Sequence, residues 1–142
     1  NDIHVREGAQ ILVVDDNKLN QMVIKQMLES IGATGIDTSG DGKDSVNLTS
    51  MKYYDMIFMD KFMPIMDGVE ATRCIRMDSK NKSQKSPIIF LSADVEEHNI
   101  SECIKAGANE FVGKPYRLDD LVDKMYKVDQ NILYTTIDRN KL

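Results

Sequence analysis

The sequence has few cysteines, no long apolar run and no excess of basic residues, and each shortage excludes a class of protein. Only Cys74 and Cys103 occur among 142 residues, both in expected helices, so we expect free thiols rather than a disulfide framework. No apolar run approaches the roughly 20 residues of a membrane-spanning helix, and no charged-then-apolar leader is present, which predicts a cytoplasmic domain without membrane contact. Binding to a phosphate backbone needs an excess of basic residues, and this chain has a formal net charge of −5. We therefore expect no direct nucleic-acid binding.

Repeats and zinc ligands are also missing. We find no repeat of about 20 to 50 residues and no low-complexity tract, which excludes a solenoid. No cluster of cysteine and histidine side chains offers a zinc site. The length and the 42% of hydrophobic residues suffice for one core, so we expect one domain over residues 10–128, between an N-terminal flank (1–9) and a C-terminal tail (129–142).

What the chain does have is a regular alternation of short apolar runs with longer helical patterns, which predicts an α/β fold with a doubly wound parallel sheet. Several of the runs are continuously apolar, as in strands buried on both faces. The expected strands are Ile11–Val14, Thr34–Thr38, Met56–Met59, Ile88–Leu91 and Glu110–Val112. The expected helices are Lys18–Ile31, Gly42–Met51, Gly68–Met77, Glu97–Ala106 and Leu118–Tyr126.

Two segments carry more detailed expectations. In the first helix, the buried stripe is expected to consist of Val23, Met27, Leu28 and Ile31, which leaves Leu19, Met22 and Gln26 on another face. The polar stretch Asp78–Ser86 is expected to be an exposed loop before the fourth strand.

Acidic residues follow the strands at their carboxyl ends. Asp15 and Asp16 come directly after the first strand and Asp60 ends the third, while Ser92 ends the fourth and Lys114 follows the fifth. In an open parallel sheet these ends share the edge where ligands bind. Three neighbouring carboxylates repel one another, and a bound hard divalent cation relieves that repulsion. Mg²⁺ suits such a site because its octahedral coordination shell readily includes a phosphate oxygen. The pattern predicts a magnesium site.

A carboxylate can itself be the nucleophile in phosphoryl transfer, and Asp60 is the best placed candidate. Mg²⁺ and Lys114 would stabilise the transferring group, and Ser92 could donate a hydrogen bond to one of its oxygens. Taken singly, an Asp-Asp pair more often caps a helix, a Lys-Pro pair more often forms a turn, and a serine at a strand end is usually just solvated. Their joint placement at the ends of four strands favours the functional interpretation.

Four ordered motifs resemble the receiver domain of two-component response regulators and hybrid histidine kinases, over roughly residues 10–128. They are Ile11-Leu-Val-Val-Asp-Asp-Asn17, Met59-Asp-Lys-Phe-Met-Pro-Ile-Met-Asp-Gly68, Leu91-Ser-Ala93, and Ala106-Gly-Ala108 continuing through Phe111 to Lys114-Pro115. The resemblance implies a flavodoxin-like (βα)₅ fold with strand order 2-1-3-4-5.

The resemblance also implies roles for particular residues. Asp60 would be the phosphoacceptor, and Mg²⁺ would be bound by Asp15, Asp16, Asp60 and the main-chain carbonyl of Phe62. Lys114 would pair with the phosphoryl group. Ser92 and Phe111 match the family's switch pair, which changes the surface of the fourth helix and fifth strand, and the Lys114–Pro115 bond is expected to be cis. Lys61 departs from the family, which more often has an apolar or small residue after the acceptor; its effect on donor access stays open.

The segment Asp15-Asp-Asn-Lys-Leu-Asn20 resembles the version found in hybrid histidine kinases and phosphorelays. The expected partners are therefore a histidine kinase or a histidine-containing phosphotransfer protein, with Leu19 and Met22 as the docking surface. The chain is expected to be part of a hybrid histidine kinase, and the alternative is a stand-alone response regulator.

A related Mg²⁺-dependent phosphatase would need a second carboxylate two residues after the acceptor, where this chain has Phe62. A degenerate receiver that serves only as an interaction module is disfavoured because all five chemical positions are filled.

Overall fold

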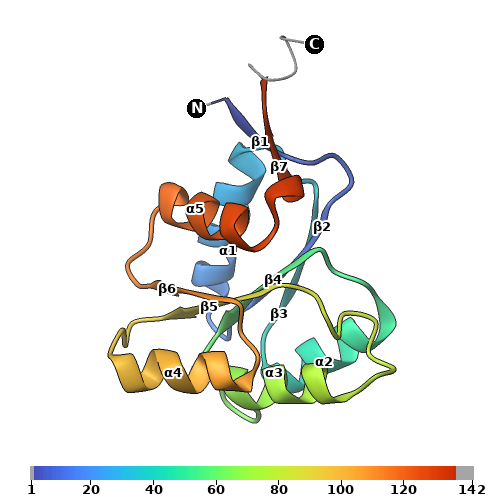
Figure 1. The fold of residues 1–142 in the computed structure, drawn as a ribbon, viewed down its shortest axis with the longest axis vertical. Coiled ribbons are helices and arrows are strands. Elements are labelled where there is room, and N and C mark those ends of the chain that lie inside the picture. The colour runs from blue at the N-terminus through green and yellow to red at the C-terminus, as the bar shows by residue number, and fades with distance from the viewer. Residues whose placement is uncertain (1, 137–142) are drawn as a thin grey trace.

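The computed structural model describes residues 2–136, which fold around a five-stranded parallel sheet (Figure 1). Its strands are β2 (Gln10–Val14), β3 (Gly35–Ser39), β4 (Met56–Asp60), β5 (Ile88–Ser92) and β6 (Glu110–Gly113). They lie in the order β3-β2-β4-β5-β6, which is the expected 2-1-3-4-5 order of the five strands along the chain. The predicted fold class is confirmed.

Five helices cover the two faces of this sheet: α1 (Lys18–Ser30), α2 (Gly42–Met51), α3 (Gly68–Met77), α4 (Glu97–Ala106) and α5 (Leu118–Val128). The helices α1 and α5 lie on one face, and α2, α3 and α4 lie on the other (Figure 1). The bounds of α2, α3 and α4 match the predicted ranges, and α1 and α5 differ from them by one or two residues.

The central strands are continuously apolar because both of their faces are covered. Every residue of β4 and β5 is buried. Successive residues of a strand point to opposite faces, so Phe58 packs in the core beneath α1 and α5 while Ile57 and Met59 pack in the core beneath α2, α3 and α4. This double burial holds the carboxyl ends of the strands in fixed register.

The buried side of α1 differs from the expected stripe. Ile24 and Leu28 are fully buried, but Val23 is 38% exposed, so its assignment to the core was wrong. Polar Gln21 takes a place on the buried side, where its Nε2 donates hydrogen bonds to the carbonyls of Asp15 and Ser39 at 2.7 and 3.1 Å. Both Nε2 donors of this buried glutamine are satisfied by carbonyls at two strand ends, which the apolar pattern alone could not show.

The segment 78–86 is less exposed than expected, because three of its polar side chains are buried. Asn81 donates from Nδ2 to the Thr49 hydroxyl at 2.9 Å, and the Ser83 hydroxyl donates to the Lys52 carbonyl at 2.8 Å. Ser86 is also buried. The Asn81 and Ser83 side chains thus fasten the loop to the end of α2, while Asp78, Ser79, Lys80, Lys82 and Lys85 are exposed as expected.

Outside the main sheet, two short strands from the ends of the described chain pair with each other. β1 (Ile3–Val5) runs antiparallel to β7 (Leu133–Thr135), which follows a 3₁₀ turn at Gln130–Ile132. The amide of Val5 donates to the Ile31 carbonyl at 2.7 Å, and Arg6 forms an ion pair of 2.9 Å with Asp55, the residue before β4. The two strands therefore lie near the amino ends of β2 and β4. No helix within residues 2–136 is long and apolar enough to cross a membrane.

Candidate functional site

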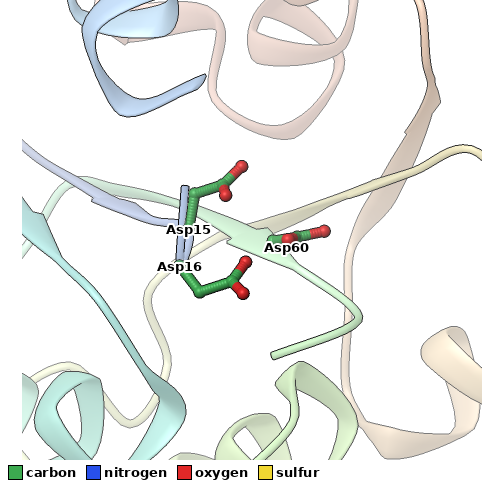
Figure 2. Close-up of side chains that lie close together, drawn as sticks. All are labelled: Asp15, Asp16 and Asp60. Atoms are coloured by element: carbon green, nitrogen blue, oxygen red, sulfur yellow. The ribbon is translucent and has the colours of Figure 1, made fainter. Parts of the chain in front are cut away.

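Three aspartates converge at the carboxyl edge of the sheet, as the motif positions predict. Asp15 and Asp16 follow β2, Asp60 ends β4, and one carboxylate oxygen from each lies within 4.8 Å of the others. Figure 2 shows the three side chains directed toward a shared space. Asp15 and Asp60 are buried, whereas Asp16 is exposed. The acidic cluster is thus buried on the Asp15 and Asp60 side and exposed to solvent on the Asp16 side.

Lys114, just after β6, brings a positive charge to this cluster. Its Nζ lies 3.4 Å from Oδ1 of Asp60 and 3.8 Å from Oδ2 of Asp15. The peptide bond to Pro115 is cis, as expected. One ammonium facing two buried carboxylates and a third exposed one leaves the site with excess negative charge.

This excess charge and burial shift the protonation of the acidic groups. Burial, and then the negative charge of Asp15, raise the pKa of Asp60 from 3.8 to about 6, although the charge of Lys114 opposes the rise. Burial also raises the pKa of Asp15. Both shifts mean that the carboxylates are held close together at a cost in free energy, which a bound cation would offset.

The donor set fits a hard divalent cation such as Mg²⁺. Oδ1 of Asp15 accepts a hydrogen bond from the Asn17 amide at 2.9 Å, but its buried Oδ2 has no hydrogen-bond partner among the described residues. A buried carboxylate oxygen without a donor is costly unless a cation or water satisfies it. All the ligand atoms of the cluster are oxygens, and Asp16 leaves one side open, as Mg²⁺ requires to keep waters and a phosphate oxygen.

The loop after Asp60 approaches the site closely at Gly68. A Cβ atom at this position would stand 2.3 Å from the main-chain oxygen of Asp60, a distance that no side chain tolerates. The Gly68 amide also donates to the Lys61 carbonyl at 2.8 Å, and Asp67 caps α3 by accepting from the Glu70 amide. The Asp-Gly pair of the motif therefore holds the β4–α3 loop, which contains Phe62, against the end of β4.

Ser92 and Phe111 lie on neighbouring strands beside the acidic cluster. Ser92 ends β5 and is buried, and its Oγ accepts a hydrogen bond from the Asp94 amide at 3.2 Å. Phe111 pairs in register with Phe90 of β5 and packs in the core beneath α2, α3 and α4. The hydroxyl is thus engaged with the β5–α4 loop, and the ring lies on the side of the sheet that α4 covers.

Three further residues lie at this edge. Gln21 and Tyr116 were not predicted to be part of the site, and Lys61 was noted in the sequence without a role. Gln21 binds the Asp15 carbonyl, as described above. Burial and the charges of Asp15 and Asp60 raise the pKa of Tyr116 to about 12, so this phenol remains neutral beside the cluster. Lys61 is buried and reaches α4. The sequence signal for Tyr116 was its position two residues after Lys114, whereas nothing in the pattern indicated where the Lys61 side chain would go.

Comparisons with known proteins agree with this geometry. Residues 11–126 match the family model of the response regulator receiver domain. The osmosensing histidine protein kinase SLN1 of Saccharomyces cerevisiae is 42% identical over 115 residues, which cover 78% of this chain and 9% of the kinase. The hybrid signal transduction histidine kinase F of Dictyostelium discoideum is 33% identical over 135 residues, covering 92% of this chain and 12% of the kinase.

A solved structure gives the same result. The receiver domain of the sensor histidine kinase PA1611 from Pseudomonas aeruginosa PAO1, solved with a magnesium ion coordinated in its active site cleft, is similar with a TM-score of 0.76 and 35% identity. The match covers 84% of this chain and 96% of that one.

The chain belongs to the response regulator receiver domain family. Receiver domains act in two-component signalling and interact with histidine kinases or phosphotransfer proteins. The chain spans only about a tenth of the length of the two histidine kinases compared above.

Proposed function

We propose that Asp60 is the phosphoacceptor of this receiver domain and that it takes a phosphoryl group from a phosphohistidine in a Mg²⁺-dependent reaction. The observation that carries the proposal is the convergence of three carboxylates with Lys114, whose Nζ lies 3.4 Å from the Asp60 carboxylate. Asp15, Asp16, Asp60 and the main-chain carbonyl of Phe62 would hold the cation.

In the transfer, a carboxylate oxygen of Asp60 attacks the phosphorus atom of the phosphoimidazole. The P–N bond breaks, its electron pair stays on the imidazole nitrogen, and Asp60 becomes an acyl phosphate. Lys114 faces the attacking oxygen and would stabilise the charge on the phosphoryl oxygens. Mg²⁺, when bound, supplies further positive charge for those oxygens. Attack of water on the acyl phosphate then returns the free carboxylate, so the domain would catalyse both its phosphorylation and its dephosphorylation.

Ser92 and Phe111 would convert the new charge into a change of surface. A phosphoryl group adds acceptor oxygens at the end of β4, next to the end of β5 where Ser92 lies. The Ser92 hydroxyl would turn to donate a hydrogen bond to one of these phosphoryl oxygens. Its Oγ now accepts from the Asp94 amide, so the β5–α4 loop would have to adjust, and the space beside Phe111 would change. The affected surface would be that of α4 and β6.

Incubation with acetyl phosphate or phosphoramidate, with and without Mg²⁺, followed by mass spectrometry tests the assignment. We expect one added phosphoryl group with Mg²⁺ and none in Asp60→Asn, because an amide cannot form an acyl phosphate. Asp123→Asn, an exposed aspartate on α5, should be labelled like the parent. Full labelling of Asp60→Asn would refute the assignment.

For the protein donor, we propose that it docks on the exposed face of α1. Leu19 and Met22 are 66% and 54% exposed and follow the acidic residues Asp15 and Asp16 by one to two helical turns, about 5 to 10 Å of rise. A shallow hollow of about 250 Å³ lies along this face, lined by Met22 together with Lys18 and Lys25. Apolar side chains flanked by lysines fit a partner helix with an apolar stripe and acidic flanks, as a histidine-containing phosphotransfer protein would offer.

Met22→Glu tests this surface. We expect phosphotransfer from a protein donor to slow at least several-fold, while labelling by acetyl phosphate stays nearly unchanged. Met77→Glu, at an 83% exposed methionine on α3, is the matched control and should leave both rates unaltered. If both rates fall together in Met22→Glu, the site or the fold has been damaged; if neither falls, α1 is not the docking face.

We also propose that the natural protein is a hybrid histidine kinase, because the two relatives described above are much longer histidine kinases, one of them a hybrid kinase by name, of which this chain matches 9% and 12%. A stand-alone response regulator is the alternative. The position of the domain in the cytoplasm stays a prediction. Determining the length of the expressed protein distinguishes the two forms, since a kinase would have a catalytic core before this domain.

A further inference from the structure

The side chain of Lys61, the residue directly after Asp60, makes an unusual set of contacts. It is a lysine with only 10% of its side chain exposed, and it leaves the end of β4 to reach α4. There its Nζ forms an ion pair of 2.7 Å with Oε1 of Glu102 and donates a hydrogen bond to Oδ1 of buried Asn99. The ammonium also lies 4.9 Å from the centre of the Phe62 ring. One buried cation thus joins the acceptor strand to a helix on the far side of a loop.

The contacts continue from Asn99 back to the switch serine. Nδ2 of Asn99 donates to the Asp94 carbonyl at 2.6 Å, and the Asp94 amide donates to Oγ of Ser92 at 3.2 Å. Asn99 is only 1% exposed, and its amide group bonds to Lys61 through Oδ1 and to the β5–α4 loop through Nδ2. The network forms a continuous path of polar contacts from Lys61 through Asn99 and Asp94 to Ser92.

The backbone of Lys61 is fixed as firmly as its side chain. Its amide donates to the Leu91 carbonyl at 3.2 Å, next to Ser92, and its carbonyl accepts from the Gly68 amide at 2.8 Å. A displacement of Asp60 or of the loop after it therefore moves Lys61. Because the Lys61 side chain contacts α4 and not water, its movement is passed on to α4. An apolar side chain at this position would fill space beside α4 but would make none of these directional bonds.

A purely structural role does not account well for a buried lysine. Removing an ammonium from water is costly, and its ion pair and hydrogen bonds typically only offset that cost, so an apolar residue is often equally stable at such a place. Buried polar networks more often specify one arrangement of the elements that they join. Here the elements joined are the acceptor strand, the β5–α4 loop, which bonds to Ser92 through Asp94, and the first two turns of α4.

We propose that Lys61 is the positioning residue that couples the acceptor site to α4. Because Lys61 holds Asn99 and Glu102, a change at Asp60 is transmitted to α4 through the lysine side chain as well as through Ser92. The inference rests on the proposed function, since it needs a phosphoryl group or its analogue to bind at Asp60.

Nuclear magnetic resonance with Mg²⁺ and beryllofluoride, which forms a phosphoryl-like adduct on a carboxylate, tests this coupling. In the parent chain we expect amide signals next to Asp60 and along α4 to shift when the adduct forms. In Lys61→Met, which keeps a side chain of similar length without charge, we expect signals next to Asp60 to shift as before and the α4 shifts to fall by at least half. In Glu102→Gln, whose amide oxygen can still accept a hydrogen bond from Lys61 although the ion pair is lost, we expect the chain to fold and to show a smaller but measurable loss of the α4 shifts.

The matched control is Lys105→Met, which removes the same charge from an exposed lysine on α4 and should retain the full response. Undiminished α4 shifts in Lys61→Met, or in Glu102→Gln should the first variant not fold, would overturn the coupling role. So would a parent chain in which only the signals next to Asp60 respond, and the acceptor assignment would then still stand. If no signal of the parent responds at all, the proposed function fails, and this inference fails with it.

Discussion

Replacing Asp60 with asparagine should make the metal-free domain more stable at neutral pH. The pKa of Asp60 is raised from 3.8 to about 6 by burial and by the neighbouring charge of Asp15, despite the opposing charge of Lys114. The folded state therefore binds a proton at this carboxyl more tightly than the unfolded chain does. Above about pH 6 the carboxylate is ionised in both states, and its unfavourable surroundings then lower the stability of the fold.

The size of the effect follows from the two pKa values. The interval between 3.8 and about 6 corresponds to about 3 kcal/mol, at about 1.4 kcal/mol for each tenfold change in proton affinity. The favourable contribution of the protonated group is complete below about pH 4 and is lost as the pH rises to about 6. Asparagine has the same shape and no charge, so Asp60→Asn should be more stable than the parent by about 1 to 3 kcal/mol at pH 7 and nearly equal to it at pH 4.

Urea unfolding in the presence of a chelator, repeated from pH 4 to pH 8, measures this difference. Asp123→Asn serves as the control, because this aspartate is exposed on α5, and it should follow the parent at every pH. Addition of Mg²⁺ should narrow the gap, since the cation binds the ionised parent and stabilises its folded state. A parent as stable as Asp60→Asn at pH 7, or a gap that does not shrink as the pH falls, would refute the account of a strained acidic cluster.

Three more results are expected. Asp16→Ala should weaken Mg²⁺ binding at least several-fold in a calorimetric titration and hardly change the melting temperature, because this carboxylate is exposed; equal affinity would count against its role as a ligand. Lys114→Ala should still accept phosphate from a small donor but lose the change in the environment of Phe111, followed by nuclear magnetic resonance; an unaltered response would exclude the role of the lysine. Lys61→Met should raise the pKa of Glu102 toward its ordinary value of 4.5, because the hydrogen bond and the charge of Lys61 hold that pKa lower. If the Glu102 carboxyl titrates in the variant as it does in the parent, the Lys61–Glu102 pair does not form in solution.

The five strands of the main sheet and the five helices could be predicted from the sequence because their signals are local, whereas β1 and β7 lie in the stretches that were expected to be a flank and a tail. Continuous apolar runs mark the strands covered on both faces, and three helices begin after Asn17, Asp41 and Asp67, side chains that accept a hydrogen bond from an amide in the first turn. The acidic cluster was predictable for a related reason: the carboxyl ends of parallel strands meet at one edge, so the Asp15-Asp16 pair after β2 and Asp60 at the end of β4 predict one site.

Polar residues with partners far along the chain could not be placed in this way. Gln21 displaces Val23 from the buried side of α1 because two carbonyls at the strand ends bind its amide group. Asn81 and Ser83 are buried in a stretch whose composition resembles a solvated loop. Lys61 is a charged residue whose partners lie on α4, about 40 residues later. Hydrophobic patterning contains no information about such pairings, since each depends on a donor and an acceptor that meet only in the folded chain.

The pairing of β1 with β7 has a consequence for how this domain can be connected to other chains. The Thr136 amide donates to the Asp2 carbonyl at 3.0 Å, so the two ends of the described segment are separated by about the spacing of adjacent strands, near 5 Å. Both ends lie near the amino ends of the sheet strands, away from the carboxyl edge where the aspartates converge. The domain can therefore be inserted through both ends into a surface loop of another protein, or closed into a ring and reopened elsewhere, with the acidic site left accessible to a donor.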